Sequence, residues 1–111
     1  MSETITLPET SQRAKREEKT KRQPPYNVVL INDDDHSFEY VIHMLQVLFG
    51  HPPERGYQMA WDVHTNGRVI VDTTTRERAE LKQEQIHAFG PDPHIVRCQG
   101  SMSAVIEPAP G

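Results

Sequence analysis

The sequence predicts an α+β domain, in which a small three-stranded antiparallel sheet packs with three helices in the order β-α-α-β-α-β. Two runs rich in β-branched residues, at 26–31 and 68–74, predict strands. Each run is followed by a segment whose apolar residues recur at the spacing of one helix face. A chain of 111 residues with 35% hydrophobic residues can form one modest core. We therefore expect a single domain with its helices on one face of the sheet.

The first strand and the helix after it are the best-defined elements. The strand covers 26–31, and in the next segment six apolar residues fall at offsets of 0, 3, 4, 7, 10 and 11 positions. Asp35 or Ser37 can cap the helix, because each offers a side-chain oxygen to the unpaired amides of the first turn. Gly50 is expected to end it in a left-handed conformation. The apolar face comprises Phe38, Val41, Ile42, Leu45, Leu48 and Phe49.

The second helix and the second strand are marked mainly by their ends. Pro52 and Pro53 suit the entry and the first turn of a helix. Asn66 and Gly67 end that helix as a turn before the strand at 68–74. The apolar positions that keep helical spacing between these ends are Tyr57, Ala60, Trp61 and His64.

The third helix is expected to begin after Thr75, which can cap it, and to run from 76 to about 89. A Gly-Pro pair closes it. The apolar and β-branched residues at 95–98 predict a last short strand, continued through Met102.

Residues 1–24 are expected to form a disordered arm, followed by the folded domain at 25–106 and a tail at 107–111. The arm holds only two strongly apolar residues, and it mixes six basic residues with four glutamates. The arm is net positive and the remainder is net negative, which argues against nucleic-acid binding. One cysteine excludes an internal disulfide. No apolar run is long enough for a membrane span, so we expect a cytoplasmic protein, a monomer that binds no membrane.

An amide and three carboxylates, Asn32 to Asp35, directly follow the first strand. They could form only a turn, because Asn and Asp side chains bond their own backbone. Four such residues in a row also gather acceptors and negative charge, as a cation site does. A metal ion is one alternative, with His36 and His64 as further ligands, but neither a helical histidine pair nor a calcium-loop pattern accompanies them. The serines and the cysteine have no nucleophile context, so catalysis is not expected.

A third interpretation joins Asn32, Asp33 and His64. An amide oxygen, a carboxylate and a neutral imidazole are three acceptors, which is what an ammonium group with three N–H donors requires. Capture of an N-terminal amine is a known mode of peptide recognition. The alternative is that His64 only caps its helix and the acidic pair only turns the chain.

Five motifs occur in order between residues 25 and 106: Leu30-Ile31-Asn32-Asp33-Asp34, Ser37-x-Glu39-Tyr40-Val41, Val63-His64-x-x-Gly67-Arg68, Thr75-x-Glu77-x-Ala79-Glu80-x-Lys82 and His94-x-x-x-Cys98. Together they resemble the ClpS family, adaptors that bring N-degron substrates to Clp protease machines. The combination of N-D-D, V-H-x-x-G and T-x-E-x-A-E-x-K is specific. The resemblance implies a ClpS-like fold, no catalytic activity of its own and no cofactor.

The resemblance also implies a substrate site. Asn32, Asp33 and His64 match the residues that hold the substrate's α-amino group, and Asp34 has a supporting part. The pocket for the first side chain is expected to be lined by Ile31, His36, Phe38, Ala60, Val63 and Val96.

A second implied surface lies on the third helix. Glu77 and Lys82 match positions that contact the N-terminal domain of a ClpA- or ClpC-like AAA+ unfoldase. The arm before Pro24 resembles the flexible extension that the unfoldase engages during delivery. The implied partners are therefore N-degron proteins and a Clp unfoldase.

Four positions depart from the family pattern. Asp35 stands where an aromatic residue is usual, and His36 stands where Thr is common, which adds a titratable group at the rim. Phe38 replaces a gating methionine and should narrow one wall, whereas Ala60 replaces a second methionine and should open another. We expect recognition of N-terminal Phe, Tyr, Trp and Leu in an altered rank order. The alternatives are a ClpS-like interaction module with another ligand, or a metal-binding protein.

Overall fold

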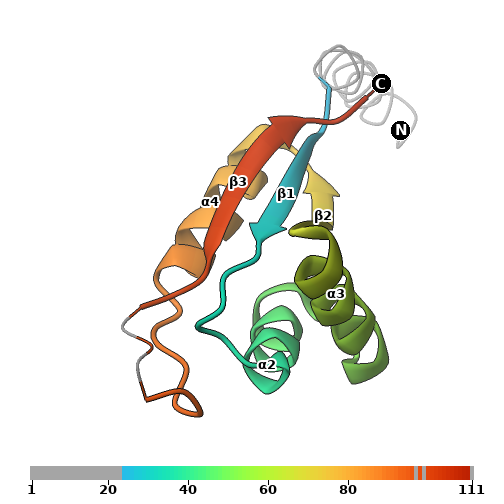
Figure 1. The fold of residues 1–111 in the computed structure, drawn as a ribbon. Coiled ribbons are helices and arrows are strands. Elements are labelled where there is room, and N and C mark those ends of the chain that lie inside the picture. Colours follow the sequence, from blue (N-terminus) through green and yellow to red (C-terminus); the bar gives the residue numbers. More distant parts are fainter. Residues whose placement is uncertain (1–23, 97, 99, 111) are drawn as a thin grey trace, which may run out of the picture.

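The computed structural model describes residues 24–96, 98 and 100–110. It confirms the predicted α+β class, with three helices and a three-stranded antiparallel sheet in the predicted order (Figure 1). The predicted arm falls almost entirely outside the described residues. The elements are β1 (Tyr26–Ile31), α2 (Phe38–Phe49), α3 (Pro53–Asn66), β2 (Arg68–Thr74), α4 (Arg76–His87) and β3 (Ser103–Pro108).

Each helix begins or ends where local chemistry predicts. Ser37 caps α2 by accepting a hydrogen bond from the backbone of Tyr40 at 3.2 Å. Thr75 caps α4 in the same way. Gly50 and Gly67 follow α2 and α3 with φ of 73° and 85°, a left-handed conformation that glycine adopts without a steric penalty. Helix α4 ends at His87, slightly earlier than predicted.

The sheet has the order β2-β1-β3, so the first strand is central and both of its neighbours run antiparallel to it. Val28 and Leu30 belong to the main core against the helices, and both are fully buried. The core cluster is completed by side chains from all three helices and from β2 and β3, among them Met44, Leu45, Met59, Val63, Val71, Ala79, Ile86 and Ala104.

Val29 is also fully buried, although it alternates with Val28 and Leu30 and lies outside the core cluster. Its cross-strand partners are Ile70 on β2 and Val105 on β3. Arg68 and Glu107 form an ion pair at 2.7 Å, and they lie opposite the two ends of β1. This pair spans the central strand and helps to shield Val29 on the face of the sheet away from the core.

The prediction of a last strand at 95–98 is wrong. In that segment the backbone N–H of Ile95 donates to Asp92, and the N–H of Cys98 donates to Ile95, which are turn contacts. The strand that pairs with β1 begins instead at Ser103 and runs through Pro108, so it includes residues predicted to be tail. Ala104 is buried in the core, an inward contact that Ile95, Val96 and Cys98 do not make.

Candidate functional site

A cavity of about 170 Å³ opens where the end of β1, the start of α2 and the end of α3 meet. Its lining combines polar and titratable side chains with apolar ones. The lining residues are Asn32, Asp33, Asp34, His36, Phe38, Val41, Ala60, Val63, His64 and Met102.

Backbone contacts bring the polar residues together. The N–H of Asn32 donates to the carbonyl of Gly67 at 3.0 Å, which fixes the end of β1 beside the end of α3. The N–H of Gly67 in turn donates to Val63 and closes that helix. As a result, His64 in the last turn of α3 shares the cavity with Asn32 and Asp33, which follow β1.

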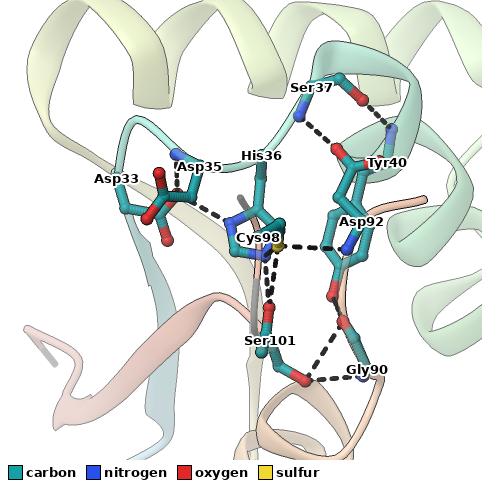
Figure 2. Close-up of polar contacts among 10 residues, drawn as sticks. Asp33, Asp35, His36, Ser37, Tyr40, Gly90, Asp92, Cys98 and Ser101 are labelled. Carbon is teal, nitrogen blue, oxygen red and sulfur yellow. Dashed lines mark hydrogen bonds and ion pairs between the residues drawn. The ribbon is translucent and has the colours of Figure 1, made fainter. Parts of the chain in front are cut away.

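Asp33 is held in place by its own loop. Its Oδ1 accepts a hydrogen bond from the backbone of Asp35 at 3.0 Å and contacts Nδ1 of His36 at 2.7 Å (Figure 2). The side chain of His36 is only 3% exposed, whereas that of Asp33 is 34% exposed. The carboxylate therefore remains accessible from the cavity while its orientation is fixed.

The apolar part of the cavity is organised by Phe38. Its ring meets the rings of Tyr57, Trp61 and His64 edge-on, with centroids 5.6–5.9 Å apart. Ala60 is buried beside it in the cavity wall. Phe38 thus packs against a cluster of rings on α3, in which Trp61 and His64 also contact each other with centroids 6.0 Å apart.

The segment after α4 is tied to the start of α2 by Asp92. This carboxylate is fully buried and accepts a hydrogen bond from the backbone N–H of Ser37 at 2.6 Å (Figure 2). It also accepts one from the backbone N–H of His94 at 2.8 Å. Burial by itself raises the pKa of the Asp92 carboxyl, but the hydrogen bonds from Ser37 and His94 together outweigh it and lower the pKa to about 2. Asp92 is therefore a charged group, next to His36, that links the segment after α4 to the start of α2.

Tyr40 makes a second link between α2 and the segment after α4. Its hydroxyl donates to the carbonyl of Gly90 at 2.6 Å, and its ring contacts that of Phe89 edge-on. Burial is the main cause that raises the pKa of the Tyr40 phenol. Neither Tyr40 nor Asp92 was assigned to the site from the sequence, because no motif marks contacts between residues about 50 positions apart.

The structure brings most of the expected substrate-site residues into one cavity, but not all of them. Val96 does not line it, and its side chain is fully exposed, so the expectation that it forms a pocket wall is wrong. The cause is the turn that replaces the predicted strand. Ile31 is also absent from the lining. Val41 and Met102 take part instead.

The two residues of α4 that were expected to contact an unfoldase differ in their exposure to solvent. Glu77 is exposed. Lys82 is only 9% exposed, and its Nζ donates to the carbonyl of Leu48 at 2.5 Å while lying 5.4 Å from the ring centroid of Phe49. The structure therefore gives Lys82 an interior partner, and its contact with an unfoldase stays a prediction. Helix α2 has no basic residue in its last turn, and Lys82 supplies the positive charge there.

Within the described part of the chain, no group of three or more His, Cys, Asp or Glu side chains could hold a metal ion. Nor is any helix there long and apolar enough to cross a membrane.

Comparisons with known proteins agree on one family. Residues 21–93 match the family described as ATP-dependent Clp protease adaptor protein ClpS. A ClpS adapter protein of Methylococcus capsulatus is 39% identical over 70 residues, which are 63% of this chain and 66% of the relative, just under two thirds of its length. One of Leptospira biflexa is 30% identical over 92 residues, 82% of this chain and 81% of the relative. The structure of Agrobacterium tumefaciens ClpS2 bound to L-phenylalaninamide is similar with a TM-score of 0.66 and 25% identity, over 78% of this chain and 98% of that chain.

Proposed function

The chain belongs to the ClpS family of ATP-dependent Clp protease adaptors, and from that premise we propose that it is an adaptor for N-degron substrates. It binds the free α-amino group and the large hydrophobic side chain of a first residue that is Phe, Tyr, Trp or Leu, and it delivers the substrate to a Clp AAA+ unfoldase. One observation carries the proposal: a single cavity is lined both by hydrogen-bond acceptors and by apolar side chains. An N-terminal residue combines an ammonium with a side chain in the same way.

The polar part of the cavity supplies the acceptors that an ammonium needs. Asn32 contributes an amide oxygen, Asp33 a carboxylate and His64 a ring nitrogen, provided that His64 is neutral. The ammonium leaves its hydration shell on binding, so the carboxylate is the partner whose loss is most costly. Removing one member of a buried charge pair costs about 2–5 kcal/mol, which corresponds to a loss of affinity of roughly 30- to 4,000-fold.

The cavity as a whole is large enough to take a large side chain. A dry cavity of roughly 150 Å³ holds a benzene molecule, and this one measures about 170 Å³. Phe38 is rigid and fixed by ring contacts, whereas Met102 can adapt to the ligand. The small side chain of Ala60 leaves room between them. Discrimination against β-branched first residues is proposed to depend on Phe38.

Delivery is proposed to use surfaces away from the cavity. Glu77 lies at the exposed start of α4 and is a candidate for contact with the N-terminal domain of the unfoldase. Residues 1–24 lead into β1 at Tyr26, and Asn32 follows the opposite end of that strand. A six-residue strand spans about 20 Å. The unfoldase can therefore engage the proposed arm without covering the substrate.

Binding of fluorescent peptides tests the substrate proposal. We expect peptides beginning with Phe or Leu to bind more tightly than those beginning with Val or Arg, and acetylation of the Phe amine to abolish binding. Asp33→Asn should weaken binding at least 30-fold, whereas the matched control Asp72→Asn, on β2 outside the cavity lining, should not. Equal binding of the acetylated peptide would contradict the proposal and favour a ClpS-like module with another ligand.

A separate experiment tests delivery. Glu77→Ala should weaken capture by an isolated ClpA- or ClpC-type N-terminal domain. The control Glu84→Ala changes another exposed glutamate of α4 and should leave capture intact. Equal loss in both variants would indicate a general charge effect and not a contact at Glu77.

A further inference from the structure

The ring of His36 lies between two oxygen acceptors. Its Nδ1 is 2.7 Å from Oδ1 of Asp33 (Figure 2). Its Nε2 is 2.8 Å from the carbonyl oxygen of Gly100. A carboxylate and a carbonyl only accept hydrogen bonds, and a neutral imidazole has a single N–H to donate. Both contacts are satisfied together only when both ring nitrogens carry protons. The geometry therefore corresponds to a cationic His36.

This cation is enclosed. The side chain of His36 is 3% exposed, so its charge needs a partner in place of water. The ring of Tyr40 packs against it with centroids 4.5 Å apart, and the sulfur of Cys98 lies 3.3 Å from Nε2. The titratable groups that surround the ring are Asp33, Asp34 and Asp35 on its own loop, Tyr40 on α2, His64 across the cavity on α3, and Asp92 and Cys98 on the segment after α4.

We propose that protonated His36 is the internal counter-ion of Asp33 in the ligand-free protein, and that the substrate's α-ammonium takes its place. This inference rests on the proposed function, because it concerns the same carboxylate. A bound α-ammonium and a protonated His36 would be two like charges on the same carboxylate, and a nearby like charge disfavours the charged form of a base. Binding therefore breaks one N–H bond of His36 and releases that proton to the solvent.

Two consequences follow for the site. Protons compete with N-terminal amines, so affinity for a Phe peptide falls as the pH is lowered and His36 becomes harder to deprotonate. The neutral ring also keeps only one N–H, and it can no longer hold Asp33 and Gly100 at once. Binding in the cavity therefore changes the hydrogen bond between His36 and the segment that follows α4.

Nuclear magnetic resonance tests the first half of the inference without any ligand. Long-range proton–nitrogen spectra distinguish an imidazole with one protonated nitrogen from one with two. At about pH 7, where an ordinary histidine is mostly neutral, we expect His36 to be protonated on both nitrogens. We expect it to be neutral in Asp33→Asn. A neutral His36 in the unaltered protein would overturn the inference and leave the proposed function standing.

Calorimetry tests the second half. The binding enthalpy of a Phe peptide is measured at about pH 7 in buffers with different ionisation enthalpies, and the slope gives the number of protons released. The unaltered protein should release close to one proton more than His36→Thr, which carries the residue common in the family, and than His36→Gln. Contributions from His64 and from the peptide amine cancel, because all three proteins share them.

The outcomes separate the two proposals. Binding with equal proton release in all three proteins refutes the competition between His36 and the ammonium, but it supports amine recognition. A protein that binds no Phe peptide, or that binds the acetylated peptide equally well, refutes the proposed function and with it the competition. In that case the resonance spectra still decide whether His36 is the counter-ion of Asp33.

Discussion

Replacement of Asp92 by Asn should reveal how strongly one buried carboxylate fastens the segment after α4 to the start of α2. The side chain is fully covered and accepts two backbone hydrogen bonds. Hydrogen bonds from Ser37 and His94 outweigh the opposing effect of burial and lower its pKa from 3.8 to about 2. At about 1.4 kcal/mol for each tenfold change in proton affinity, the ionised carboxylate stabilises the fold by about 2 kcal/mol.

The sign of the pH dependence follows from the lowered pKa. The folded protein holds the proton of Asp92 less tightly than the unfolded chain does, so the stabilisation is fully present above about pH 4 and is lost as the pH falls toward 2. The assay is urea denaturation of both proteins at several values between about pH 7 and pH 3. The difference in the free energy of unfolding should be constant near neutrality and should shrink below about pH 4.

His94→Ala is the matched control. It removes one side-chain contact to Asp92 but keeps both backbone donors, so it should cost less than Asp92→Asn. A difference between the unaltered protein and Asp92→Asn that stays constant down to about pH 3 would refute the reasoning. It would mean that shape, and not ionisation, accounts for the loss.

Three further substitutions address packing and charge. Tyr40→Phe removes a buried hydroxyl donor and should lower the free energy of unfolding by about 1 kcal/mol at neutral pH. Because burial raises the pKa of this phenol, the unaltered protein should lose stability as the pH rises above about 10. The variant should lose less over the same range, which urea denaturation can measure. Replacement of a glycine by alanine normally stabilises a helix by about 1 kcal/mol, but in Gly56→Ala the new Cβ would lie 3.3 Å from the backbone of Ile42. We therefore expect no rise in the thermal midpoint of unfolding. A rise of several degrees would contradict this. Lys82→Met keeps the buried stem but removes the charge at Leu48, and it should lower stability by about 1 kcal/mol without changing peptide affinity.

The fold could be predicted wherever local chemistry decides the structure. Ser37, Gly50, Gly67 and Thr75 mark helix ends through their own hydrogen bonds or dihedral angles, and the structure has all four at those places. The order of strands and helices followed from β-branched runs, from apolar spacing and from the residues at helix ends. All these signals lie within one element or at its ends, so they are readable without knowledge of the tertiary structure.

The last strand could not be predicted in the same way. Residues 95–98 have strand-like composition, but Asp92 competes for that segment by drawing it into turns. The choice between 95–98 and 103–108 depends on which segment can cover the core beside β1, a non-local criterion. The same error misplaced Val96, because a side chain expected on a strand instead points into solvent.

For the candidate site, motifs indicated the residues but not their surroundings. Asn32, Asp33 and His64 were singled out by their acceptor chemistry. The contacts of His36 with Gly100 and Cys98 join positions more than 60 residues apart, which no spacing rule reaches. Lys82 shows the converse. A charged residue on a polar helix is normally exposed, but the open end of α2 provides it with an interior partner.

The position of β1 between β2 and β3 has a consequence for folding during synthesis on the ribosome. The first strand of the chain pairs with the last one, over a separation of more than 70 residues. Closing so long a loop is slow relative to forming helices. A nascent chain that has exposed only residues up to about 100 lacks both β3 and Met102, one wall of the cavity. The cavity can therefore be completed only after Met102 and β3 have left the ribosome.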